Sequence, residues 1–168
     1  MSEQITAHTR QPVSNGPLPI PYTAEEVGRT FADLLETLDY ATELYELGVG
    51  KLRIFKRARV KSHLTAVSIA LWNIALGKSF PNDADAFFTH FTSTYPPLTG
   101  DAKNAKQLLE LVIHYDSLAK ERKDADFTCL ADAIVEAIGT QGKDERSQQL
   151  RLSLHIRGLY GLIFEKLI

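Results

Sequence analysis

One long helix, charged at its start and apolar in its second half, most constrains the fold of this chain. Residues Leu64–Leu76, LTAVSIALWNIAL, are apolar on most faces of a helix, which is typical of a helix packed on several sides. They follow the cationic segment Lys51–Lys61, KLRIFKRARVK, in which six of eleven residues are Lys or Arg. Such charges cannot be buried without partners. The sequence therefore predicts one helix from about Lys51 to Leu76, whose start protrudes or pairs with acids.

The length and composition of the chain favour a single domain. With 168 residues, 44% of them hydrophobic, folding can bury roughly 70% of the surface of the unfolded chain. Cys129 is the single cysteine, so an intrachain disulfide is excluded and a cytoplasmic location is favoured. The Leu64–Leu76 run is shorter than the roughly 18 residues of a membrane span, so no membrane partner is expected.

The first part of the chain predicts an arm followed by an acidic helix. Residues 1–22 contain four of the seven prolines, which favours an extended N-terminal arm and leaves 23–168 as the helical domain. Thr23 and Glu26 have the spacing of a capping box, so a helix is expected from Thr23 to Leu47, ended by Gly48 and Gly50. This helix carries seven acids: Glu25, Glu26, Asp33, Glu36, Asp39, Glu43 and Glu46.

The rest of the chain predicts four further helices. The third opens at Asn82 or Asp83 and stops before Pro96 and Pro97, and the fourth opens at Thr99 or Asp101. The fifth helix is expected over residues 127–138 and ends at Gly139. The sixth is expected over residues 144–167, where apolar residues at helical spacing continue for longer than a short alternation that resembles a strand. The sequence thus predicts an all-α, up-and-down helical bundle of five to six helices.

The last predicted helix carries more apolar surface than one face can bury. Leu150, Leu154, Phe164 and Ile168 form a second apolar set beside the main stripe. Gly158 and Gly161 also lie within this helix, where each costs about 1 kcal/mol relative to alanine, and close packing by another helix would explain both. We therefore expect a homo-oligomer or a stable protein partner.

The cationic segment allows three interpretations. It can pair with the acidic helix, in the same subunit or in a neighbour. It can bind an acidic protein partner. It can also bind the phosphates of RNA or DNA, for which Phe55 offers little stacking capacity, so low sequence preference is expected. The residues predicted to contact nucleic acid are Lys51, Arg53, Lys56, Arg57, Arg59 and Lys61.

Catalytic and metal-binding patterns are weak in this sequence. Arg57 and His63 have the Arg-x5-His spacing of helical ribonucleases of the HEPN class, and the alternative is a histidine exposed to solvent. Glu110 and His114, one turn apart, are interpreted as a surface pair, and Cys129 as a core residue. The sequence predicts no catalytic residue, no metal ligand and no cofactor, and therefore a binding protein rather than an enzyme. An adaptor that uses the acidic and basic helices for assembly is the alternative.

Parts of the chain resemble a known family. The string AVSIALWNIALG at Ala66–Gly77, LYELG at Leu44–Gly48 and LYGLIFEKL at Leu159–Leu167 resemble the four-helix proteins encoded within ribosomal RNA intervening sequences. The resemblance covers about half of the chain. It implies an up-and-down four-helix bundle related to the accessory proteins of diversity-generating retroelements, which form pentameric barrels and bind nucleic acid through basic surfaces. The contact residues that it implies are those of the cationic segment.

Overall fold

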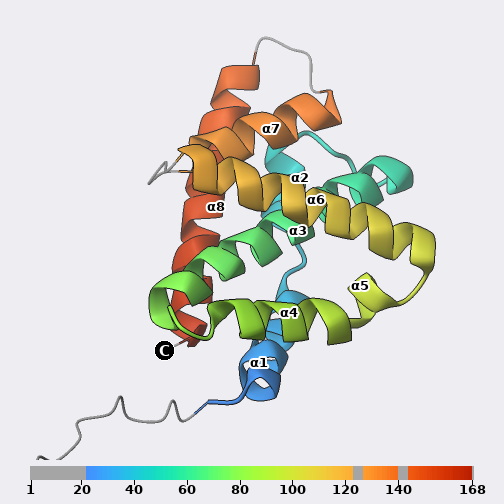
Figure 1. Ribbon diagram of the computed structural model, residues 1–168. Helices are drawn as coiled ribbons and strands as arrows, with labels where there is room; N and C mark the ends of the chain where they lie inside the picture. The colour runs from blue at the N-terminus through green and yellow to red at the C-terminus, as the bar shows by residue number, and fades with distance from the viewer. Residues whose placement is uncertain (1–21, 123–126, 140–143, 168) are drawn as a thin grey trace, which may run out of the picture.

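Every regular element in the described part of the chain is a helix. The computed structural model describes residues 22–122, 127–139 and 144–167 (Figure 1). Within them lie α1 (Ala24–Thr37), α2 (Ala41–Glu46), α3 (Ile54–Ser79), α4 (Ala84–Thr94), α5 (Pro96–Thr99), α6 (Ala102–Arg122), α7 (Thr128–Ile138) and α8 (Glu145–Leu167). The prediction of an all-α fold is confirmed. The predicted N-terminal arm, apart from Tyr22, lies outside the described residues.

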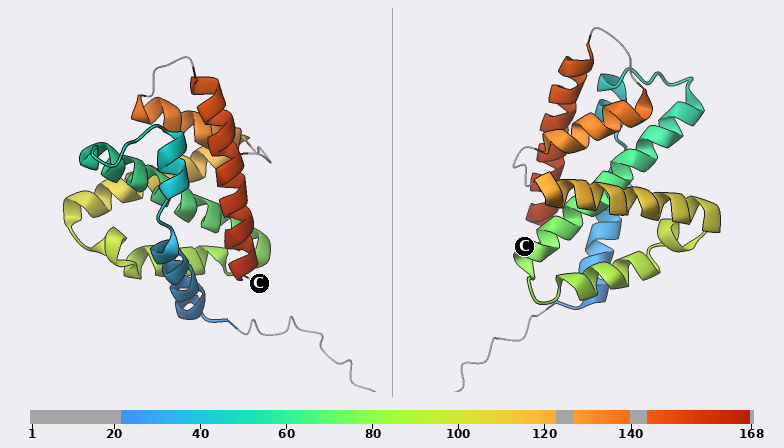
Figure 2. Two further views of the ribbon diagram at one scale, coloured as in Figure 1. Left: turned by 180° about the vertical axis from the view of Figure 1, so that it is seen from behind. Right: turned by 45° about the horizontal axis from the view of Figure 1, so that its top comes forward.

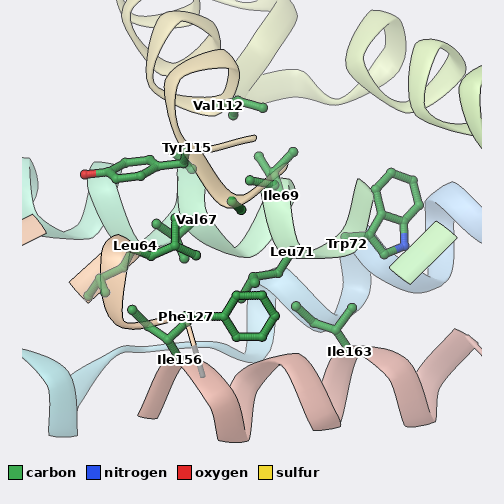
Figure 3. Packing of buried hydrophobic residues seen from close by; sticks show 14 of the residues in the cluster. Leu64, Val67, Ile69, Leu71, Trp72, Val112, Tyr115, Phe127, Ile156 and Ile163 are labelled. Carbon is green, nitrogen blue, oxygen red and sulfur yellow. The ribbon is translucent and has the colours of Figure 1, made fainter. Parts of the chain in front are cut away.

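The helices are arranged around α3, which packs against α1, α4, α6, α7 and α8. In both Figure 1 and Figure 2, α8 stands along one side of the molecule while α4, α6 and α7 run across it. The second half of α3 is therefore enclosed, and its side chains from Val67 to Trp72 are fully buried (Figure 3). This enclosure confirms the expected central helix.

Aromatic stacking fixes one end of the core. The indole of Trp72 stacks on the ring of Phe31 from α1, with centroids 4.5 Å apart and planes 2° apart. Phe91 from α4 lies 4.8 Å from the same indole. Offset-stacked and tilted aromatic pairs of this kind contribute about 1 kcal/mol each beyond their buried area. Phe87 and Phe91 of α4 thus belong to the core.

The predicted helix Thr23–Leu47 is two helices, and the expectation of one is wrong. The capping box is present, since Glu26 N–H donates to Thr23 Oγ1 at 3.2 Å and Thr23 N–H donates to Glu26 Oε2 at 2.9 Å. The helix nevertheless ends at Thr37, and Tyr40 adopts a left-handed conformation with φ 54°. Its buried hydroxyl lies 2.9 Å from Ser68 Oγ of α3. This long-range contact fixes Tyr40, which allows α2 to start in a new direction.

Two other boundaries also differ from those expected. The helix predicted from Lys51 begins only at Ile54, and it continues through Gly77 to Ser79 rather than stopping at Gly77. Pro96 and Pro97 follow the end of α4, as predicted, but they also open the short helix α5, because proline is favoured in the first turn of a helix. With the division of the first helix, α5 brings the number of helices above the predicted five or six.

The last helix, α8, is helical throughout its described length, so the choice of helix over strand is confirmed. Its apolar residues Leu152, Ile156 and Ile163 are buried against the core. Leu150 and Leu154 are about 60% exposed. A Cβ added at Gly158 or Gly161 would meet nothing within 4 Å in the described structure. No helix of the described part of this chain packs closely on these glycines.

Candidate nucleic-acid interface

The cationic segment lies where α3 leaves the body of the molecule. Gly48, with φ 66°, ends α2, and the N–H of Val49 donates to Leu44 O at 2.9 Å to close the turn. A short connection then leads to Ile54, so Lys51 and Arg53 precede the helix instead of lying within it. In the views of Figures 1 and 2, the first turn of α3 lies at the outer edge of the molecule. The segment therefore protrudes.

The positive charges of this segment are accessible. Lys51, Arg53, Arg59 and Lys61 are exposed, while Lys56 and Arg57 are half-buried. Among the residues that the structure describes, none of the six has a carboxylate oxygen within 4.0 Å. These cations thus form an open patch of charge that no described carboxylate neutralises, and such a patch attracts anions.

Two of the six are held by backbone carbonyls. Arg57 Nη1 donates to Val49 O at 3.3 Å, and Arg59 Nη2 donates to Ala137 O at 2.8 Å. The carbonyl of Ala137 belongs to the last turn of α7, where a cation is favoured by the helix dipole. These bonds fix the direction of both guanidinium groups and leave their other N–H donors for a ligand.

Three acids of the first two helices have other partners. Glu25 pairs with Arg29 on the same helix, and Glu46 Oε2 lies 2.7 Å from Arg151 Nη1 of α8. Glu43 Oε1 lies 3.9 Å from His155 Nδ1, also on α8. The expected pairing of the cationic segment with the acidic helix of the same chain is therefore not present in the described residues.

Three large apolar side chains stand among the cations, and sequence analysis gave no weight to two of them. Leu52 is 96% exposed, Ile54 is 71% exposed and Phe55 is 91% exposed. A helix turns about 100° per residue, so Arg59 and Lys61 lie on opposite flanks of the exposed ridge that Phe55 and Ala58 form. The site consequently combines an aromatic face with positive charge on both sides.

A cleft of about 560 Å³ adjoins the cationic segment between α3 and α6. Its lining includes Arg59 and Ser62 from α3 and the amide side chains Asn104 and Gln107 from α6. These neutral hydrogen-bonding groups are separated from the cations by more than 40 residues of sequence. No local pattern could have associated them with the site.

His63 and Arg57 have different hydrogen-bond partners in the described structure. The ring of His63 is buried, and its Nδ1 lies 2.7 Å from the hydroxyl of Tyr115 on α6. Arg57 instead turns toward Val49. Burial lowers the pKa of His63, and the nearby Arg59 and His114 lower it further. The interpretation of His63 as exposed to solvent is wrong, because this neutral ring is part of the core.

The remaining candidate residues lie on α6 and α7. Glu110 and His114 are both exposed on α6, as predicted for surface residues, but Glu110 also lines the cleft beside Arg59 and has its ion pair with Lys106, at 3.9 Å. Cys129 on α7 is buried, as predicted for a core residue. Among the described residues, no three His, Cys, Asp or Glu side chains gather so as to hold a metal ion. No helix in the described ranges is long and apolar enough to cross a membrane.

Comparison of the chain with models of known protein families, with curated proteins and with solved structures gave no match. The resemblance to the intervening-sequence proteins stays a prediction. The candidate site is accordingly defined by its own geometry and charge.

Proposed function

We propose that this protein binds single-stranded RNA or DNA through the cationic segment and does not catalyse a reaction. The observation that carries the proposal is that six exposed or half-exposed cations have no carboxylate partner within the described structure. Lysine and arginine in this state neutralise phosphates and release condensed counterions. The exposed ring of Phe55 supplies a surface on which one base can stack.

A salt titration of binding to a mixed-sequence oligonucleotide tests this proposal. If six phosphates of a single strand are neutralised, log affinity should fall with log salt concentration at a slope of about −4. Replacing Lys51, Arg53 and Lys61 by Gln should weaken binding and reduce the slope by about 2. These three side chains have no intrachain ion pair in the described structure, so the fold should be unchanged.

The matched control removes three exposed cations elsewhere that likewise make no ion pair within the described residues, by replacing Lys78, Arg146 and Lys166 with Gln. Both triple variants change the net charge by the same amount, so only a local contact distinguishes them. Equal losses of affinity in the two variants would contradict a defined site. Absence of binding at low salt, or stronger binding to anionic lipid vesicles than to the oligonucleotide, would overturn the proposal.

The aromatic part of the site has its own test. Phe55→Ala should weaken binding of single strands by about 1–3 kcal/mol through lost stacking, with no loss of folding stability. Tyr45→Ala is the matched control, because Tyr45 is an 80% exposed aromatic residue outside the segment. A similar loss in both variants, or no loss in either, would exclude stacking on Phe55.

An assembly function is the second candidate. Asp33, Glu36 and Asp39 are exposed and make no ion pair within the described residues. They could therefore meet the cationic segment of a neighbouring copy, and electrostatic contacts of this kind mainly steer association. If that is their role, replacing these three acids by their amides should reduce self-association and leave oligonucleotide binding unchanged.

A further inference from the structure

The outer side of α8 carries an exposed stripe that no described part of the chain covers. Exposed residues recur every three or four positions along the helix, and we call this set the outer stripe: Leu150, Arg151, Leu154, Arg157, Gly158, Gly161, Leu162 and Glu165. In the left view of Figure 2, α8 lies along one side of the molecule and no other helix is drawn in front of it. The outer stripe is therefore free to meet another molecule.

The two glycines at the centre of this stripe are unexplained by the isolated chain. A glycine in a helix interior costs about 1 kcal/mol relative to alanine. Such a cost is commonly retained where another backbone approaches closely, yet Gly158 and Gly161 face open space in the described structure. Leucines stand on both sides of them, with Leu154 60% exposed and Leu162 36% exposed. This pattern fits the surface of one helix that packs closely on a second.

We propose that α8 packs against α8 of a second copy of this chain, antiparallel and related by a two-fold axis at Gly158. Under such an axis, a residue that precedes Gly158 meets the residue that follows it by the same number of positions. Leu154 and Leu162 are each four positions from Gly158, so each would face the other in the partner. The bare glycine lets the two backbones approach until these leucines are in contact.

Two charges of the stripe, Arg151 and Glu165, favour this antiparallel orientation. Arg151 and Glu165 are each seven positions from Gly158, so the axis places Arg151 of one copy opposite Glu165 of the other. Glu165 makes no ion pair within the described residues. Arg151 uses one nitrogen for Glu46 and keeps further N–H donors. In a parallel pair, Arg151 would instead face Arg151 of the other copy and Glu165 would face Glu165. Like charges in contact are unfavourable.

The oligomeric state of the full chain provides the first test. Sedimentation equilibrium should show a dimer, and Gly158→Gln should raise its dissociation constant by at least about tenfold because the longer side chain separates the helices. Gly77→Gln is the matched control, since Gly77 is also an exposed helical glycine with open space around it, but on α3. It should leave the dimer unchanged. Circular dichroism should show the same helix content in all three proteins.

Cross-linking tests the position of the axis. Because residue 158 would meet its own copy, Gly158→Cys should form an intermolecular disulfide under mild oxidation, whereas Gly77→Cys should not. The wild-type chain controls for Cys129, its one native cysteine, which is buried. Glu165→Lys should weaken the dimer at low salt and have less effect at high salt.

The result expected is a dimer that Gly158→Gln dissociates and that Gly158→Cys traps. A monomer at every concentration tested would overturn the proposal, as would a dimer that Gly158→Gln leaves intact or equal cross-linking at positions 158 and 77. None of these measurements uses nucleic acid. The dimer and the proposed binding function therefore stand or fall separately.

Discussion

The two ends of α3 both carry large apolar side chains and place them in opposite environments. Ile54 and Phe55 in its first turn are 71% and 91% exposed, while Leu71 and Trp72 in its second half are fully buried. The difference lies in the neighbours, because the second half is enclosed by the helices packed on α3 while the first turn extends to the edge of the molecule. Apolar character alone does not place a side chain in the core.

Different costs follow from these two environments. Exposing a buried aromatic residue to water, or removing it, loses transfer free energy and packing. Removing an aromatic residue that already lies in water loses neither transfer free energy nor packing. An apolar side chain that stays in water next to several cations therefore adds nothing to folding stability, so we connect its presence with binding rather than with the core.

The largest expected effect is a difference in the free energy of unfolding between substitutions at the two ends of α3. Trp72→Ala should lower the free energy of unfolding by about 3–5 kcal/mol, because the cavity left between Phe31 and Phe91 cannot collapse fully. Phe55→Ala should change it by no more than about 0.5 kcal/mol. Urea denaturation of both variants measures the difference. A comparable loss in the two would mean that Phe55 is packed against the protein, and the comparison would fail.

Local sequence signals predicted the parts of the fold that depend on neighbours in the chain. The capping box of Thr23 and Glu26 and the left-handed glycines at Gly48 and Gly139 are all present, because each is settled within a few residues. The apolar periodicity likewise predicted α6, α7 and α8 closely. Periodicity and caps are properties that one sequence shows without an alignment.

The features that sequence analysis missed depend on distant contacts. The break before α2 is fixed by Tyr40 and Ser68, which are 28 residues apart, and the burial of His63 is fixed by Tyr115, 52 residues away. Within the candidate site, the six cations were identified by composition. Three features could be known only from the positions of α2, α6 and α8: the lack of acidic partners for these cations in the described ranges, the exposure of Leu52 and Ile54, and the adjoining cleft.

An intermediate effect is expected where the two parts of α3 meet, at His63. Burial lowers the pKa of this histidine in the folded state, so the unfolded chain binds the proton more readily. Stability is therefore full above the ordinary histidine pKa and falls as the pH drops below it, toward the lowered value. Denaturant midpoints at a series of pH values between about 8 and 5 measure this loss.

Replacement of His63 should remove the corresponding part of the pH dependence. His63→Gln keeps a hydrogen-bonding side chain beside Tyr115, and His90→Gln is the matched control on α4. The control should show the pH dependence of the wild type. If His63→Gln also showed it in full, the buried neutral ring would not be its source.

The smallest effects are expected at two glycines, Gly48 before α3 and Gly77 within it, and they have opposite signs. Gly77→Ala should stabilise the fold by up to about 1 kcal/mol, since the helix continues through this position and a Cβ there meets nothing within 4 Å. Gly48→Ala should destabilise it by about 1–2 kcal/mol, because φ is 66° there and L-residues with a Cβ rarely adopt this conformation. Both positions have open space, so only backbone conformation distinguishes them. If the free energy of unfolding changed equally in the two variants, the turn before the cationic segment would not require a glycine. The direction in which the chain passes from α2 to α3 would then not depend on Gly48.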